Sequence, residues 1–308
     1  MKLKIKTLKL ENVNEAISNN IKETISFAES EYRGQLFELA SKIYKKKDCK
    51  IVLLAGGSCA GKTTTARLLK EILEKMGKDV KTVSLDNFFK NRADTPVLPN
   101  GNKDYDSLNA LLLDELEKCF GDLFTTGEAK FPDYNFLTGI NTKNVHHITC
   151  DKNTIIIFEG LHTINPEICK RLCTKGFMRV YIGPINAIKY DRYVMSPEDL
   201  RLVRRTVRDL KRRGYSILHT VKTWPDVLEG EDKYIKPYTK KVDFIINTTH
   251  CYEIGLYKDL FLEEYESHKK DLPELEFIEI IKNAKGFNKT LVPTTSLMWE
   301  FVDQKDMK

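Results

Sequence analysis

The chain has 308 residues, a formal net charge of +6, 41% hydrophobic residues and 31% charged residues. These values suit a soluble globular protein of one large or two modest domains, and the mild positive charge fits an anionic ligand without requiring nucleic acid. No stretch has the length and apolarity of a membrane span, the first ten residues lack the apolar core of a signal peptide, and the seven cysteines form no C-x-x-C pair for zinc. We therefore expect a reducing, cytoplasmic location and no membrane or nucleic-acid partner.

An N-terminal arm, residues 1–48, precedes the most informative motif. Alternation of lysine with apolar residues predicts a strand within residues 1–10, and helices are expected over residues 13–31 and 33–47. The arm is too short for an independent domain. We expect it to pack on the body formed by residues 49–308.

A phosphate-binding loop follows the arm. Residues 51–54 form a continuous apolar run, as in a buried parallel strand, and helical spacing of apolar residues begins after Thr64. Between them lies a match to G-x-x-x-x-G-K-[ST], whose glycines let backbone N–H groups turn toward phosphate oxygens. Lys62 can reach the β- and γ-phosphates, and the Thr63 hydroxyl suits Mg²⁺. The predicted nucleotide-binding residues are Gly56, Gly57, Ser58, Cys59, Ala60, Gly61, Lys62, Thr63 and Thr64.

Two acidic residues stand at the ends of further predicted strands. Asp86 follows the strand expected over residues 80–85, and Glu159 ends the apolar run at residues 154–159. Ligands of open α/β sheets bind at the carboxyl ends of strands, so Asp86 is a candidate base and Glu159 a candidate ligand of Mg²⁺ or its waters. The alternatives are a helix cap for Asp86 and a turn carboxylate for Glu159. The remaining predicted strands span residues 178–182 and 242–247.

Residues between these strands are candidates for substrate contact. Asp106 precedes a predicted helix and is either the N-terminal acid of that helix or a ligand of sugar hydroxyls. A small β excursion is expected over residues 124–149, where Tyr134 and Phe136 alternate and so share one face. These two rings either line a pocket for a flat base or pack as ordinary strand residues.

A helix predicted over residues 199–214 carries an apolar face and a basic face. Like charges at this spacing are unfavourable in an isolated helix, and an anion that neutralises them would explain the pattern. The helix is therefore predicted to form a lid over phosphates, against the alternative of a solvated charged face. Its arginines are Arg201, Arg204, Arg205, Arg208 and Arg212.

The last part of the chain is predicted to contain a helix over residues 252–272 and a short strand over residues 277–281. In the tail, residues 291–302, apolar side chains such as Trp299 and Phe301 favour docking onto the body.

Taken together, the motifs resemble the phosphoribulokinase/uridine kinase family. The resemblance rests on G-G-S-C-A-G-K-T-T at 56–64, S-L-D-N-F-F at 84–89, Y-N-F at 134–136, F-E-G at 158–160 and R-L-V-R-R-T-V-R-D at 201–209. It implies a three-layer α/β P-loop kinase fold with a five-stranded parallel core sheet, a small β excursion and a helical lid. Three shorter matches (R-G-Y at 213–215, W-P at 224–225, Y-I-K-P at 234–237) resemble a longer bacterial uridine kinase-like branch, whose long N-terminal region is not expected here.

The resemblance implies transfer of the ATP γ-phosphate to a hydroxyl, typically the 5′-OH of a nucleoside such as uridine or cytidine. Asp86 stands where the family has its catalytic aspartate, and Asp106 stands near the family's ribose-binding acidic residue. Tyr134 and Phe136 match the family's aromatic residues that contact the pyrimidine. ATP and Mg²⁺ are the implied cofactors, with the metal at Thr63 and Glu159. The predicted lid roles are catalysis for Arg205, nucleotide binding for Arg204 and Arg208, and substrate contact for Arg201.

The chain departs from the family pattern at the acceptor side. Asn135 stands where the family often has aspartate, Phe89 where it often has tyrosine, and no histidine follows Phe136. Two alternatives therefore remain, a kinase of the same fold acting on a sugar, sugar phosphate or other small metabolite, and a nucleotide-binding regulator without kinase activity. A basic pocket for a second phosphate near Asp106 would favour a phosphorylated acceptor. The oligomeric state is left open, a homo-oligomer included.

Overall fold

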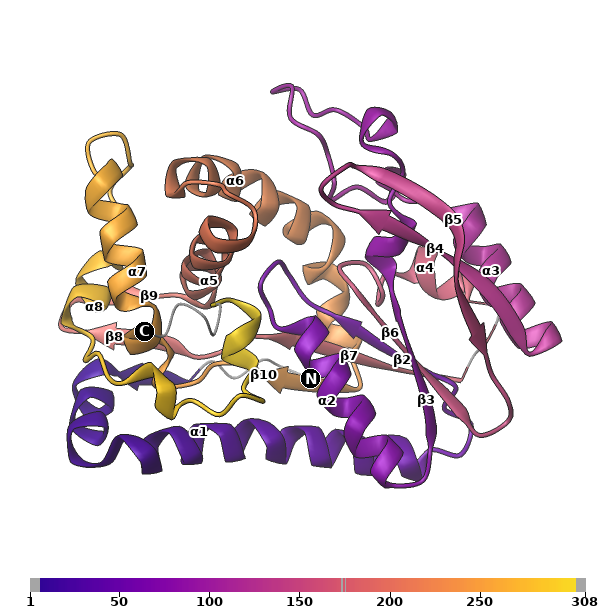
Figure 1. Cartoon of the computed structure of the whole chain (residues 1–308), viewed down its shortest axis with the longest axis horizontal. Coiled ribbons are helices and arrows are strands. Elements are labelled where there is room, and N and C mark those ends of the chain that lie inside the picture. The colour runs from indigo at the N-terminus through magenta and orange to yellow at the C-terminus, as the bar shows by residue number, and fades with distance from the viewer. Residues whose placement is uncertain (1–5, 173, 175, 303–308) are drawn as a thin grey trace.

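The computed structural model describes residues 6–172, 174 and 176–302 and is built around a five-stranded parallel sheet (Figure 1). The strand order is β10-β7-β2-β6-β3, so the central strand β2 pairs with β6 on one side and β7 on the other. The strands are β2 (Ile51–Ala55), β3 (Asp79–Ser84), β6 (Thr154–Gly160), β7 (Phe177–Gly183) and β10 (Phe244–Asn247). The five parallel strands predicted from apolar runs are confirmed.

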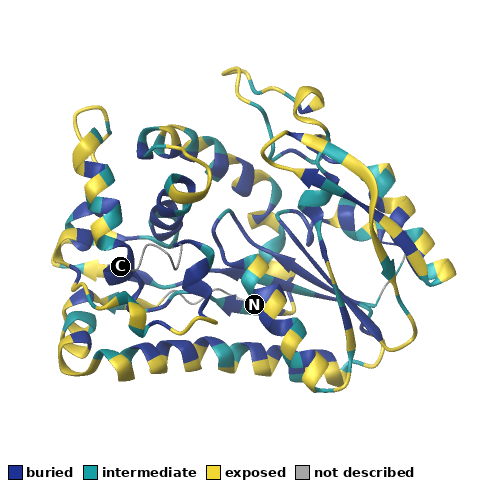
Figure 2. Ribbon diagram, viewed as in Figure 1, coloured by how far each residue is buried: buried dark blue, intermediate teal, exposed yellow. Residues whose placement is uncertain are grey.

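Helices cover both faces of this sheet. Within the described residues they are α1 (Leu10–Lys45), α2 (Lys62–Lys75), α3 (Leu113–Thr126), α4 (Pro166–Arg171), α5 (Pro197–Arg212), α6 (Ile217–Tyr234), α7 (Glu253–His268) and α8 (Ile278–Asn283). Val52 and Leu54 of β2 belong to the hydrophobic cluster that includes α1 and α2, whereas Ile51 and Leu53 belong to a second cluster with α3 and α4. Successive strand residues point to opposite faces of the sheet. Since helices cover both faces, every residue of β2 is buried (Figure 2). The predicted three-layer α/β fold is confirmed.

Two smaller sheets flank the core. The predicted β excursion is an antiparallel hairpin of β4 (Glu128–Asn135) and β5 (Ile140–Thr149). A three-stranded sheet joins β1 (Thr7–Lys9) to β8 (Ala187–Tyr190) and β9 (Tyr193–Met195). The N-terminal strand thus adds to the body beside β8, and the part of its predicted range before residue 6 lies outside the described residues.

The arm forms one long kinked helix rather than two helices separated near residue 32. The kink is at Asn20, whose backbone is non-helical (φ −158°, ψ 89°). The Asn20 side chain accepts a hydrogen bond from the Glu23 backbone N–H at 3.2 Å and donates to the Glu23 carboxylate, which starts the second segment as a capping pair. On one face of the sheet, α1 packs against α2 and β10 (Figure 1).

The strand predicted over residues 277–281 is wrong, because this stretch forms α8. Ile278, Ile280 and Ile281 are buried there, and a short helix buries all three against α7, β8 and β9. Docking of the tail is confirmed, since Leu297 and Phe301 are fully buried. Among the described residues, no helix combines the length and apolarity needed to cross a bilayer.

Candidate nucleotide and acceptor site

The phosphate loop, residues 56–64, connects the centre of the sheet to α2, as the motif predicted. Its backbone requires small residues. A Cβ on Gly56 would collide with the carbonyl oxygen of Ile182. A Cβ on Gly57 would collide with the side chains of Arg201 and Glu231. Gly61 has φ +94°, and its missing side chain leaves room for Leu297. These close approaches explain the glycines of the motif in terms of backbone geometry.

Three carbonyl groups of the loop accept hydrogen bonds from its buried underside. Ser58 O accepts from Arg201 at 3.3 Å, Cys59 O from Arg204 at 3.3 Å, and Ala60 O from the Thr248 hydroxyl at 2.9 Å. These three hydrogen bonds fix the buried side of the loop, and in phosphate-binding loops it is the backbone N–H groups that contact the ligand.

Arg201 and Arg204, here called the inner arginines, are not on an open face of α5. Both are buried; Arg201 binds the Glu231 carboxylate in bidentate fashion, at 2.6 Å through its Nη2, and Arg204 binds Glu253 at 2.7 and 2.9 Å. The expectation of one basic face turned toward phosphates is therefore wrong for these two residues. Their positive charges are neutralised by buried glutamates that lie 30 and 49 residues away in the chain.

Arg205 and Arg208, here called the outer arginines, lie on the more accessible side of α5. Both contact Asp209, Arg208 through two hydrogen bonds of 2.7 and 2.9 Å and Arg205 through a looser contact of 3.4 Å. The Arg205 guanidinium also lies over the Trp224 ring, 5.9 Å from its centroid. Because several arginines share one carboxylate, this cluster keeps a net positive charge. Arg212, the fifth arginine, donates to the carbonyl oxygen of Trp299 in the tail.

Asp86 and Glu159 come together at the carboxyl edge of the sheet, as the strand ends predicted. Ser84 pairs in register with Glu159 and donates its hydroxyl to that carboxylate at 2.8 Å. The same hydroxyl oxygen accepts the backbone N–H of Asp86 at 3.3 Å, so one serine positions both acids.

Burial changes the acidity of both groups. It raises the pKa of Glu159 to about 7, with the negative charge of Asp86 as the second cause and Lys62 acting in the opposite direction. Burial also raises the pKa of Asp86, while the charges of Lys62, Arg213 and Arg208 oppose the shift. Two such carboxylates beside a lysine are a favourable setting for a cation or for proton transfer.

Lys62 and Thr63 lie at the mouth of the loop. The Lys62 ammonium donates to the carbonyl oxygen of Gly57 at 3.0 Å, and Thr63 is exposed at the first turn of α2. No group of three or more histidine, cysteine, aspartate or glutamate side chains within the described residues forms a metal site of its own. Mg²⁺ commonly binds through one or two protein oxygens together with substrate phosphates, so Thr63 and Glu159 fit that pattern.

Aromatic rings gather on the acceptor side. The Phe89 ring contacts the rings of Tyr105, Tyr134 and Phe136, with centroid separations of 5.8, 5.5 and 6.3 Å. The guanidinium of Arg213 lies 5.8 Å from the Phe136 centroid. The predicted pair Tyr134 and Phe136 thus does share one face, and Phe89 and Tyr105 extend it. The predicted site residues omitted Tyr105 and Arg213, although Tyr105 directly precedes the candidate Asp106 and Arg213 begins the R-G-Y match at 213–215.

Asp106 lies in acidic surroundings. Burial is the main cause that raises its pKa to about 7, and the negative charge of Glu231 is the second cause. The positive charge of Arg205 opposes the shift. The ring of His162, which is buried, lies close to the Asp106 backbone. The surroundings of Asp106 therefore differ from the basic pocket that a second phosphate on the acceptor would need.

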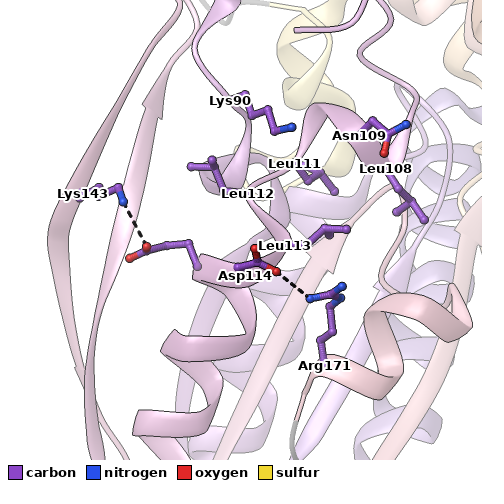
Figure 3. A pocket seen from close by; sticks show the side chains of 10 residues that line it. Lys90, Leu108, Asn109, Leu111, Leu112, Leu113, Asp114, Lys143 and Arg171 are labelled. Carbon is purple, nitrogen blue, oxygen red and sulfur yellow. Dashed lines mark hydrogen bonds and ion pairs between the residues drawn. The ribbon is translucent and has the colours of Figure 1, made fainter. Parts of the chain in front are cut away.

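A separate surface pocket of about 370 Å³ opens beside the N-terminus of α3 (Figure 3). It is lined by Lys90, Leu108, Asn109, Leu111, Leu112, Leu113, Asp114, Glu115, Lys143 and Arg171. Two of its cations bind acids of its own wall, Lys143 to Glu115 and Arg171 to Asp114. None of these lining residues belongs to the predicted site.

A family model and several known proteins match this chain. The family model described as "Phosphoribulokinase / Uridine kinase family" matches residues 51–255. The chain belongs to the phosphoribulokinase/uridine kinase family. Among curated relatives, the uridine kinase of Staphylococcus haemolyticus is 27% identical over 64% of this chain and 86% of its own length, and that of Halobacterium salinarum is 24% identical over 63% and 77%. A solved structure of a possible uridine kinase from Bacillus stearothermophilus is 18% identical, covers 70% of this chain and 98% of its own, and has a TM-score of 0.48.

Family membership makes the chain a P-loop kinase, a phosphotransferase that acts on a small-molecule substrate. The matched region contains the phosphate loop, Asp86, Glu159 and all of α5. It leaves out α1 and everything after residue 255, and the division of the chain into an arm of residues 1–48 and a kinase domain of residues 49–308 stays a prediction.

Proposed function

We propose that this protein transfers the γ-phosphate of ATP to a hydroxyl group, with the 5′-OH of a nucleoside such as uridine or cytidine as acceptor. The observation that carries the proposal is the convergence of Lys62, Asp86 and Glu159 at the carboxyl edge of the sheet, where the charges of Lys62 and Asp86 both act on Glu159. This supplies a cation for phosphate and a carboxylate for an acceptor hydroxyl in one place.

In the proposed mechanism, the loop amides and Lys62 bind the phosphates of ATP. Asp86 accepts the proton of the acceptor hydroxyl, or orients that hydroxyl in line with the γ-phosphate. Thr63 and Glu159 would hold Mg²⁺, which neutralises phosphate charge when bound. Arg205 and Arg208 stabilise the negative charge of the transferred group, and the paired inner arginines keep the loop in shape.

The aromatic cluster supports a flat acceptor. Phe89, Tyr105, Tyr134 and Phe136 offer ring faces and edges that suit a nucleobase. Asp106 among other acids supports hydroxyl recognition, because a phosphorylated acceptor would meet repulsion there. A neutral sugar or another polyol is the second candidate, favoured by Phe89 and Asn135, where the family often has tyrosine and aspartate.

The test is a substrate panel. Purified protein is incubated with Mg²⁺, either ATP or GTP, and one candidate acceptor at a time from a set of nucleosides, sugars, sugar phosphates and polyols. The formation of ADP or GDP is followed, and the mass of the phosphorylated product is measured. We expect uridine or cytidine 5′-monophosphate. A sugar or polyol product would replace the nucleoside assignment.

Lys62→Ala is the matched control for this panel. It should abolish turnover without unfolding the protein, because it removes the cation that the loop itself supplies to the β- and γ-phosphates. Normal activity in a folded Lys62→Ala protein would refute the assignment of the phosphate loop.

A further inference from the structure

The tail, residues 291–302, crosses the phosphate loop. Leu297 lies against Gly61, and the backbone N–H of Thr64, at the start of α2, donates to the carboxylate of Glu300 at 3.0 Å. Thr64 is one of the loop residues predicted to bind phosphate. Both contacts come from residues beyond the family match, which ends at residue 255.

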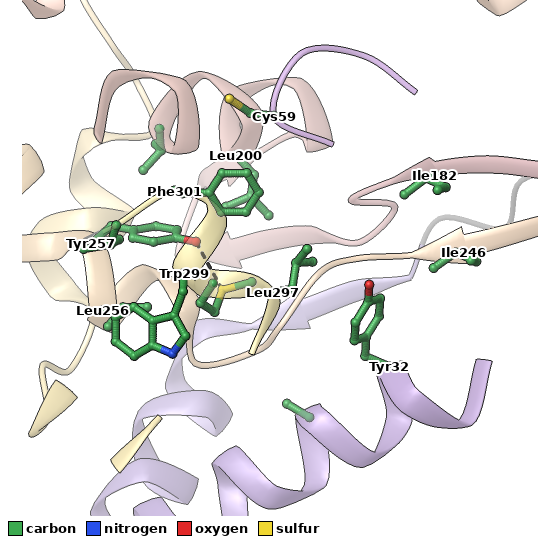
Figure 4. Close-up of a cluster of buried hydrophobic side chains, with 14 of the residues drawn as sticks. Tyr32, Cys59, Ile182, Leu200, Ile246, Leu256, Tyr257, Leu297, Trp299 and Phe301 are labelled. Atoms are coloured by element: carbon green, nitrogen blue, oxygen red, sulfur yellow. Dashed lines mark hydrogen bonds between the residues drawn. The ribbon is translucent and has the colours of Figure 1, made fainter. Parts of the chain in front are cut away.

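Buried side chains keep this tail docked. Leu297, Met298 and Phe301 are fully buried, and Figure 4 shows Leu297, Trp299 and Phe301 among the core side chains. The Arg204 guanidinium lies 4.8 Å from the Phe301 centroid, and Ser296 donates to the buried carboxylate of Glu29 on α1. Glu300 itself is only half-buried, so its side chain can turn away while these anchors remain in place.

The carboxylate of Glu300 occupies a position that suits a phosphate oxygen. The first N–H groups of a helix have no intrahelical partner and carry the positive end of the helix dipole, so they bind anions. In a phosphate loop these same groups bind the phosphates of the nucleotide. A carboxylate and a phosphate oxygen cannot both accept from the Thr64 amide, and Glu300 adds negative charge close to Glu159 and Arg208.

We propose that Glu300 is a tethered competitor for the phosphate site and thereby sets the affinity for nucleotide. Nucleotide binds when the Glu300 side chain leaves the Thr64 amide, and the buried part of the tail stays docked. This inference rests on the proposed function, because it assumes that the loop binds phosphates.

The experiment measures binding of two probes, ADP and inorganic pyrophosphate, by calorimetry. Wild type is compared with Glu300→Ala, which removes the competing carboxylate, and Glu300→Gln, which removes its charge but keeps an acceptor. Glu274→Ala is the matched control, since this exposed carboxylate lies outside the tail. Thermal unfolding of each variant shows that it is folded.

Glu300→Ala should bind both probes roughly tenfold more tightly than wild type, because one charged hydrogen bond no longer has to be broken. Glu300→Gln should show a smaller gain, and Glu274→Ala none. Unchanged or weaker binding in Glu300→Ala would overturn the inference. So would a gain confined to ADP, which would mean that the residue acts on the nucleoside part of the ligand.

The two proposals fail in different ways. If wild type binds both probes and Glu300→Ala binds them equally well, the competitor is refuted and the kinase proposal is untouched. If no folded variant binds either probe, the proposed function itself fails, and this inference falls with it.

Discussion

Beneath the phosphate loop, Arg201 and Arg204 each bind a buried glutamate, whereas on the open side Asp86 and Glu159 repel each other and burial raises the pKa of both. The first arrangement satisfies every charge and fixes the loop backbone. The second keeps two carboxylates in an unfavourable state that a bound cation would relieve. The same short loop therefore separates charges that support the fold from charges proposed to act on substrate, and substitutions on the two sides should have different effects.

The largest effect is expected on the open side, from Asp86→Asn. This change keeps the size and an acceptor atom but removes the base, and general-base loss costs about 10²–10⁴ in kcat. ATP affinity should change little, because the residue faces the acceptor. Turnover and ATP calorimetry are measured together, with Asp94→Asn on the exposed loop as control. Near-normal turnover would exclude the base role, and loss of ATP and Mg²⁺ binding would move Asp86 to the metal.

Beneath the loop, Arg204→Met should mainly lower stability. The variant leaves the Glu253 carboxylate buried without its partner, which costs about 3–5 kcal/mol in the free energy of unfolding. Urea denaturation measures the loss, and Arg205→Met is the comparison, since the Arg205 side chain is 15% exposed and lies on the same helix. Equal destabilisation by the two substitutions would remove the distinction between inner and outer arginines.

The outer arginines provide the converse test. Arg205→Ala should lower kcat by roughly 10² with a smaller effect on the KM for ATP, because the guanidinium is proposed to stabilise charge that develops during transfer. Its melting temperature should stay close to that of wild type. A raised KM with unchanged kcat would instead indicate binding of ground-state phosphate.

The smallest effect is a pH-dependent one at Glu159. Its folded-state pKa of about 7 exceeds the ordinary value of 4.5, so the folded protein binds a proton on the Glu159 carboxylate more tightly than the unfolded chain does. The free energy of unfolding that this proton contributes is therefore lost as the pH rises from about 4.5 through 7. Glu159→Gln should therefore be about 1–3 kcal/mol more stable than wild type at pH 8 and equal to it at pH 4.5. Without ligand, denaturation at the two pH values checks this. A stability difference independent of pH would contradict it.

The sheet and the phosphate loop could be predicted because their signals are local. A strand buried on both faces is a continuous apolar run, as at residues 51–54, and the loop needs glycine at fixed positions. The acidic residues at strand ends could be predicted equally well, since parallel strands bring Asp86 and Glu159 to one edge of the sheet.

The environment of α5 could not be predicted in the same way. Arg201 and Arg204 have the same spacing as Arg205 and Arg208, and what distinguishes them is contact with Glu231 and Glu253, residues remote in sequence. Glu300 was missed for the same reason, because nothing local links it to Thr64, 236 residues away. For α8, three isoleucines fitted a strand and a short helix equally well, and tertiary packing decided.

The long helix α1 has a consequence for the order in which the chain folds. It is synthesised before its partners, because Gln35 bonds to the backbone of Asn247, Glu29 to Tyr252, and Arg33 to Thr295, more than 200 residues later. Until those partners leave the ribosome, the apolar stripe of α1 stays uncovered. Contacts of such long sequence separation slow folding and expose the nascent chain to aggregation. We expect refolding from denaturant to be slow and its yield to depend on protein concentration.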